Sequence, residues 1–230
     1  MKATDVMTTN VVTVGPETSV QQVAHILLAR HISAVPVVSQ NGELLGIVSE
    51  GDLMRRTETA TVRRRSWWLE LLTSDETSAA EFVRSHSGKV TDVMTRKVVT
   101  ADPDSSLAEI ATLLERNGIK RVPIVKDGKV VGIVSRANLL QALASERRDI
   151  PAAIATNDAT IRDNVIACLK GQSWTGTWPI NIIVHNGTVE LWGLVGSEAE
   201  KAGVRVIAEE SEGVGAVNNN LVVRPFLVSE

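Results

Sequence analysis

The sequence lacks tyrosine and has a single cysteine, Cys168, among its 230 residues. A lone cysteine cannot form an intramolecular disulfide, which is typical of proteins from reducing compartments. No apolar run approaches the roughly 20 residues that a membrane-spanning helix needs, and residues 1–5 lack the apolar core of a signal peptide. We therefore expect a cytoplasmic protein.

An excess of charge of either sign is also missing. The 24 basic and 27 acidic residues give a net charge of −3, and 43% of the residues are hydrophobic. This composition is that of a globular chain long enough for one large domain or two small ones. A slightly acidic chain is not suited to coating nucleic-acid phosphates, so nucleic acid is disfavoured as a partner.

Motifs that carry catalysis or bind metals are absent as well. The four histidines (His25, His31, His86 and His185) are scattered, and no Cys/His spacing indicates a zinc site. No glycine-rich phosphate loop or dinucleotide fingerprint is found. Cys168 stands in no nucleophile motif and is interpreted as a small helix residue. We expect no metal and no enzymatic activity.

An internal repeat organises the first two thirds of the chain. Four blocks of the first copy recur 86 or 87 residues later: Asp5–Thr8 at 92–95, Val11–Thr13 at 98–100, Val35-Pro36 at 122–123, and Gly46–Ser49 at 132–135. Matched blocks at a nearly fixed offset indicate a duplicated structural unit rather than coincidental Val-rich strands.

Each copy predicts the element order β-α-β-β-α. A short strand at 11–14 precedes a helix capped by Thr18 or Ser19. An Asn-Gly or Asp-Gly turn then joins two strands into a hairpin. A last helix is predicted to start near Asp52 in the first copy and near Asn138 in the second.

These blocks resemble the cystathionine β-synthase-type (CBS) repeat, two copies of which form a Bateman module. We assign repeat 1 to residues 1–56 and repeat 2 to residues 88–147. The resemblance implies an α+β fold and a regulatory, signal-transduction role. It also implies that an adenosine nucleotide of the AMP, ADP, ATP or NAD class binds in clefts between the repeats, and that the modules pair into a homodimer.

The chemistry of a nucleotide site can be matched to the first repeat. A carboxylate can accept both hydroxyls of a ribose, and a helix N-terminus favours phosphate. By resemblance, Ser49 and Asp52 take the phosphate and ribose roles, and the base lies near Thr13, Val35 and Ile47. The alternative is that Asp52 only caps its helix and no ligand binds.

The second copy departs from this pattern. Ser135 is kept, but Asn138 replaces the aspartate and offers one acceptor oxygen without a charge. Arg121 and Arg136, together with Lys120, add positive charge that suits a polyphosphate or dinucleotide tail. Their alternative role is solvated surface charge, which we favour for Lys120. We expect two unequal sites or a single occupied one.

The segment between the repeats, residues 57–87, combines Arg63–Arg65 with Trp67-Trp68. Basic residues beside tryptophan also occur at nucleic-acid and membrane surfaces. Since the stretch is short and the chain acidic, we favour packing on the repeats or on a second subunit.

Residues 153–228 predict a separate domain of order α-β-β-α-β. Ile182 and Val184 occupy alternate positions of a predicted strand that ends at the Asn186-Gly187 turn. A two-residue turn pairs Ile182 with Leu191 and Val184 with Val189, so that these apolar side chains lie on one face of the sheet. Ser197 and Glu200 predict a capping box for the second helix.

This region resembles the BON domain through the block Ile182–Gly193 and the segment Gly213–Leu221. The resemblance implies attachment to phospholipid or to a protein partner, as the output of the module. Trp174, Trp178 and Trp192 would touch lipid or cover a small core, and we favour the core. A structural or membrane-surface adaptor with unoccupied CBS clefts is the alternative function.

Overall fold

The computed structural model describes residues 1–54, 87–145, 158–175 and 179–224. Arg63–Arg65, Trp67-Trp68 and Trp178 lie outside the described residues, so the predictions for them stay predictions. The described helices and the strands, which pair mainly as antiparallel hairpins, form an α+β fold. The chain divides into two units. The repeat-1 unit holds residues 12–98 and 127–130, and the repeat-2 unit holds residues 1–11, 99–126 and 131–230.

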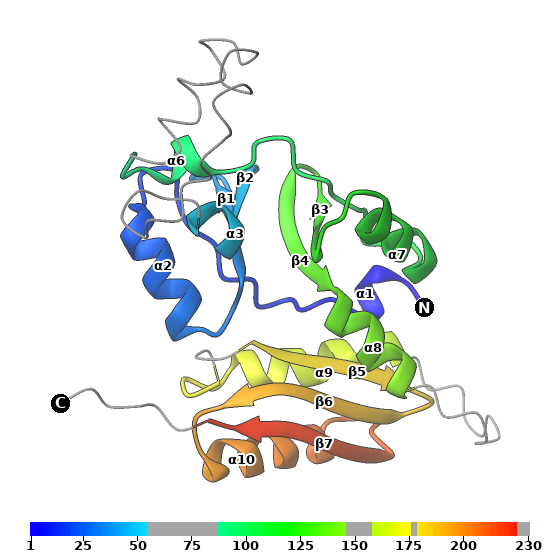
Figure 1. Ribbon diagram of the computed structural model, residues 1–230. Helices are drawn as coiled ribbons and strands as arrows, with labels where there is room; N and C mark the ends of the chain where they lie inside the picture. Colours follow the sequence, from blue (N-terminus) through cyan, green and yellow to red (C-terminus); the bar gives the residue numbers. More distant parts are fainter. Residues whose placement is uncertain (55–86, 146–157, 176–178, 225–230) are drawn as a thin grey trace, which may run out of the picture. The chain divides into compact units, whose positions relative to one another are not determined.

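The repeat-1 unit is built around the hairpin of β1 (Ala34–Val38) and β2 (Leu44–Ser49). The strands pair antiparallel, with Val35 opposite Val48 and Pro36 opposite Ile47. Among the described residues, the same unit also holds the helices α2 (Val20–Ala29), α3 (Glu50–Leu53) and α6 (Val90–Val93) (Figure 1).

The start of α2 follows its sequence signal. Ser19 accepts from the Gln22 amide at 3.1 Å, and the Gln22 side chain accepts from the Ser19 amide at 2.9 Å. This is a reciprocal capping box. The strand predicted at 11–14 is wrong, because only Val14 forms a bridge, parallel to Val37.

The core of this unit joins α2, the hairpin and α6. Its fully buried members are valines: Val23, Val35, Val37, Val48 and Val90. Met94 follows α6 and lies over Gly46, where a Cβ would stand 2.6 Å from the Met94 Sδ. Thr95 then pairs with Ile47 through two main-chain hydrogen bonds of 2.9 and 3.0 Å.

The repeat-2 unit begins with the N-terminal segment, which includes α1 (Ala3–Val6). Its further elements are α7 (Leu107–Arg116), β3 (Arg121–Lys126), α8 (Arg136–Ser145) and β4 (Lys129–Ser135), of which residues 131–135 belong to this unit. Met7 lies over Gly132, and Thr8 bridges Ile133. Each Asp-Val-Met-Thr block thus packs on the hairpin of the other sequence copy.

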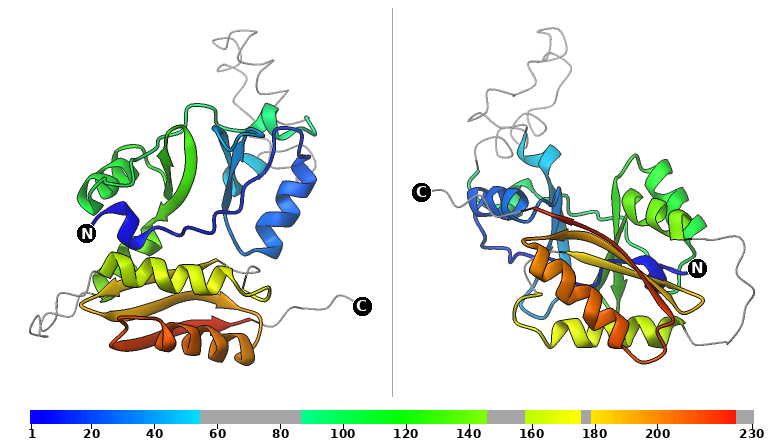
Figure 2. Two further views of the ribbon diagram at one scale, coloured as in Figure 1. Left: turned by 180° about the vertical axis from the view of Figure 1, so that it is seen from behind. Right: turned by 90° about the horizontal axis from the view of Figure 1, so that it is seen from below.

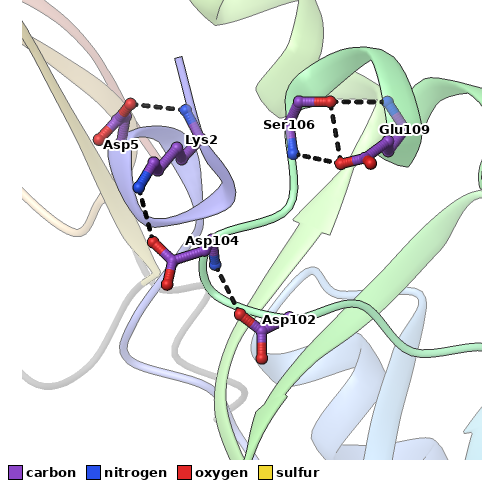
Figure 3. Close-up of polar contacts among 6 residues, drawn as sticks. All are labelled: Lys2, Asp5, Asp102, Asp104, Ser106 and Glu109. Atoms are coloured by element: carbon purple, nitrogen blue, oxygen red, sulfur yellow. Dashed lines mark hydrogen bonds and ion pairs between the residues drawn. The ribbon is translucent and has the colours of Figure 1, made fainter.

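Polar contacts anchor the N-terminal segment beside α7 (Figure 3). The Lys2 Nζ lies 2.8 Å from Asp104 Oδ1, and this hydrogen bond lowers the pKa of the Asp104 carboxyl. The Ala3 amide donates to the Ser105 carbonyl at 2.8 Å. At the start of α7, Ser106 and Glu109 form a second capping box.

The C-terminal region has the predicted order: α9 (Asp158–Lys170), β5 (Ile180–His185), β6 (Thr188–Val195), α10 (Glu198–Glu210) and β7 (Ala216–Val223). Ile182 pairs with Leu191 and Val184 with Val189, as predicted, and β7 pairs parallel with β6. Both helices pack on one face of the sheet (Figure 2), around a core that includes Val165, Val189 and Leu221.

The cap of α10 differs from the prediction in one bond. Ser197 accepts from the Glu200 amide at 3.1 Å, as a cap residue should. The Glu200 carboxylate, however, accepts from the Gly196 amide at 2.8 Å and not from Ser197. The reciprocal half of the box is therefore shifted by one residue.

Candidate functional site

The turn from β2 to α3 holds the central pair of candidate residues. Ser49 ends the strand and α3 begins at Glu50, two residues before the predicted start. The amide and the hydroxyl of Ser49 both donate to Asp52 Oδ2, at 2.8 and 2.7 Å. Asp52 is thus the third helix residue, whose carboxylate closes back on the residue before the helix.

The second carboxylate oxygen of Asp52 is left for other donors. Both bonds from Ser49 converge on Oδ2, and among the described residues no donor is bonded to Oδ1. The side chain is half-buried rather than enclosed. Since an ionised carboxylate accepts about four hydrogen bonds, this turn can accept further bonds from hydroxyl groups.

The three residues assigned to the base lie differently. Thr13 is exposed and Ile47 is half-buried. Val35 is wholly buried in the valine core, so its side chain is turned away from any surface site. The main chain links these positions, because Val14 donates to the Pro36 carbonyl at 3.0 Å and Pro36 pairs with Ile47.

Thr95 was not singled out from the sequence, although it flanks the candidate site. It pairs with Ile47, two residues before Ser49. The available signal was its place at the end of the second Asp-Val-Met-Thr block.

The equivalent turn of the second repeat is closed by its own chain. The amide and hydroxyl of Ser135 donate to Asn138 Oδ1 at 2.7 and 2.6 Å. The Asn138 Nδ2 donates to the Val6 carbonyl at 3.2 Å and to Thr8 Oγ1 at 3.4 Å. Asn138 is only 4% exposed. Both of its amide hydrogens and its oxygen are therefore already engaged.

The two arginines assigned to this repeat belong to the same unit as Asn138. Arg121 opens β3 and is half-buried, whereas Arg136 opens α8 and is exposed. The candidate residues of repeat 1 and those of repeat 2 belong to different units.

Two of the three C-terminal tryptophans are described, of which Trp192 is partly buried and Trp174 is 37% exposed. Trp192 packs against the core cluster that contains Met7 and Ala142. The Trp174 ring lies over Gly203, where a Cβ would stand 2.6 Å from the ring. Among the described helices, none combines the length and the apolar character needed to cross a bilayer. The described residues also hold no cluster of three or more His, Cys, Asp or Glu side chains placed for a metal.

Comparison with known proteins agrees with this arrangement. The family model of the CBS domain matches residues 3–58 and 90–145, and that of the BON domain matches residues 157–225. A protein of Methanocaldococcus jannaschii, MJ1426, is 37% identical over 123 residues, which cover 49% of this chain and 73% of that protein. The CBS domain-containing protein YhcV of Bacillus subtilis is 30% identical, covering 59% of this chain and 80% of YhcV.

Among solved structures, CBSX2 in complex with AMP is similar with a TM-score of 0.56 and 29% identity, covering 64% of this chain and 99% of that one. The chloroplast protein CBSX2 of Arabidopsis thaliana is 30% identical to this chain over 149 residues, which cover 61% of each protein. The duplicated hairpins and these matches agree on one family. The chain belongs to the CBS-domain proteins, with two CBS domains followed by a BON domain.

Proposed function

We propose that this protein is a regulatory module that binds an adenosine nucleotide, of the AMP, ADP, ATP or NAD class, at the Ser49–Asp52 turn of repeat 1. The observation that carries the proposal is Asp52 Oδ1, a carboxylate oxygen left over after the cap is formed. A ribose hydroxyl can donate to it in a charge-assisted hydrogen bond. The AMP complex of CBSX2 supports a ligand of this class.

Ser49 acts on this site mainly through Asp52. Its amide and hydroxyl hydrogens are both spent on Oδ2, and these two bonds fix the carboxylate. A phosphate contact from Ser49 requires its hydroxyl to rotate away from Asp52. Exposed Thr13 and half-buried Ile47 supply the neighbouring surface for the base.

One nucleotide for each chain is the stoichiometry that these contacts favour. Asn138 stands where Asp52 stands in repeat 1, but its hydrogen-bonding groups are engaged by Ser135, Val6 and Thr8. A ligand at the second turn would have to break at least one of these bonds. Leaving a buried partner without its bond costs about 1–3 kcal/mol, so the first turn binds more tightly.

The test is calorimetric titration of AMP, ATP and NAD into the wild type and Asp52→Asn. Asparagine keeps an acceptor for Ser49, as Asn138 does in repeat 2, but it removes the charge. We expect AMP affinity to fall roughly 10- to 100-fold, the range for a lost hydrogen bond to a charged group. The matched control is Glu50→Gln, an exposed neighbour outside the Ser49 contacts. Equal losses in both variants, or no loss in Asp52→Asn, would refute the assignment.

The BON domain is proposed as the output of the module, toward a protein partner or a phospholipid surface, in a cytoplasmic homodimer without catalytic activity. Support for this part is the BON match and the resemblance of the repeats to paired modules. Co-sedimentation with anionic liposomes and light scattering on the full chain test the surface and the dimer. If the protein binds no nucleotide but co-sediments with liposomes, it is a membrane-surface adaptor instead.

A further inference from the structure

A buried arginine joins the C-terminal domain to the N-terminal segment within the repeat-2 unit. Arg162 lies on α9 and is only 5% exposed. Its Nε donates to the Ile182 carbonyl at 2.7 Å, and its Nη2 donates to the Met7 carbonyl at 2.6 Å. Because a buried guanidinium is costly unless it is hydrogen-bonded, these two carbonyls fix its position.

The Met7 carbonyl that Arg162 holds lies in the middle of the segment that Asn138 holds. Asn138 Nδ2 bonds to Val6 on one side of Met7 and to Thr8 on the other. Val6, Met7 and Thr8 each accept a hydrogen bond: Val6 and Thr8 from Asn138 of repeat 2, and Met7 from Arg162 of the C-terminal domain. Movement of this segment away from Asn138 also pulls Met7 from Arg162.

Two further contacts seat the C-terminal domain on the same elements. Asn181 Nδ2 on β5 donates to Gln141 Oε1 on α8 at 2.8 Å. Ile183 is wholly buried and shares a core cluster with Met7 and Ala142 rather than with its own domain. Strand β5 therefore carries Ile182 and Val184 into the BON core and Ile183 into the core of repeat 2.

We infer that the BON domain, through Arg162, holds the second CBS turn in its self-bonded arrangement and so opposes nucleotide binding there. Arg162 is a positioning residue, since it acts on Asn138 through Val6–Thr8. A nucleotide that uses Asn138 must take its amide from Val6 and Thr8, which the Arg162–Met7 bond resists. Coupling of this kind is reciprocal, so occupancy of the second turn also loosens the BON domain. The inference rests on the proposed function, which makes the CBS turns nucleotide sites and AMP the probe.

The experiment uses the full chain carrying Asp52→Asn, in which AMP binding at the first turn is expected to be roughly 10- to 100-fold weaker. Into this background we introduce Arg162→Gln, which removes the charge of the buried guanidinium. The control is Arg205→Gln. Arg205 is an exposed arginine on α10 whose Nη1 lies 2.6 Å from the Glu209 carboxylate. Calorimetry should show AMP binding at least about 10-fold tighter in the Arg162 variant, within the usual range of coupling between sites. An isotherm equal to that of the control would overturn the inference.

A second readout separates this inference from the proposed function. Hydrogen exchange without nucleotide should be faster for the amides of residues 3–8 in Arg162→Gln, and AMP should accelerate exchange in β5 of the wild type only when the second turn fills. If wild type and Asp52→Asn bind AMP equally while Arg162→Gln gains affinity, the proposed first site fails and the coupling stands.

Should Arg162→Gln not fold by circular dichroism, Arg162→Lys replaces it. Lysine keeps the positive charge, but its single ammonium group cannot reproduce the two guanidinium bonds to the Ile182 and Met7 carbonyls. AMP affinity at the second turn should rise by a smaller factor than in Arg162→Gln. Unchanged affinity and unchanged exchange in residues 3–8 would then overturn the inference.

Discussion

Met94 covers Gly46 so closely that a Cβ on residue 46 would stand 2.6 Å from the Met94 Sδ and 3.0 Å from the Thr95 carbonyl oxygen. Met7 covers Gly132 in the same way in the other unit. A methionine of the other sequence copy thus packs directly on the glycine that begins each Gly-Ile-Val-Ser block. This packing brings Thr95 beside Ile47 and Thr8 beside Ile133, next to the two candidate turns.

Gly46→Ala should therefore destabilise the protein by about 1–3 kcal/mol, the usual cost of overpacking a filled core. Met94 is 4% exposed and has little room to move, and the Thr95 carbonyl belongs to the main chain. Urea unfolding followed by circular dichroism measures the change. The matched control is Gly15→Ala, where a Cβ meets nothing within 4 Å. Equal midpoints for the two variants would contradict the account.

The amide at position 138 and the acid at position 52 should not be interchangeable. Asn138→Asp removes the donors to Val6 and Thr8 and should destabilise the fold by about 1–3 kcal/mol, since a buried carbonyl loses its partner. Asp52→Asn keeps an acceptor for Ser49 and should change stability by less than about 1 kcal/mol. Chemical denaturation of both variants measures the difference. The reverse order of costs would show that Asn138 does not hold the N-terminal segment.

The capping box of α7 should be visible in an acid titration. Hydrogen bonds from the Ser106 amide and hydroxyl lower the pKa of the Glu109 carboxyl. Because the folded-state pKa is depressed, the stabilisation is present above the ordinary glutamate pKa and is lost as the pH falls through the folded value. Ser106→Ala should also weaken the helix by about 1 kcal/mol.

Carbon-detected NMR titration of the Glu109 carboxyl measures this effect. The midpoint should lie below that of a free glutamate in the wild type and should move up in Ser106→Ala, while Glu115, outside the box, serves as the internal control. A Glu109 midpoint that does not respond to the Ser106 change would contradict the capping role.

Much of the fold could be predicted from the sequence because its signals are local. The Asn-Gly and Asp-Gly turns, the Ser19 cap and the alternation from Ile182 to Leu191 are each set by neighbouring residues. The strand at 11–14 was predicted wrongly because Val11–Val14 have the right residue types but pair only at Val14.

The site was less accessible to such reasoning, because its decisive contacts are distant in sequence. The spacing of Ser49 and Asp52 indicates the turn, and the Asn138 substitution predicts unequal repeats. The bonds from Asn138 to Val6 and Thr8 span 132 and 130 residues, and no local pattern signals them. Val35 was assigned to the base of the nucleotide. The residue types of its strand do not indicate that the first four residues, 34–37, are all buried.

The most direct measurement is a diffraction structure of the full chain grown with AMP. The account predicts a ribose hydroxyl within about 3 Å of Asp52 Oδ1, a normal hydrogen-bond distance, with Ser49 still bonded to Oδ2. AMP bound away from Asp52, or Asp52 Oδ1 occupied by a donor of the protein itself, would contradict it.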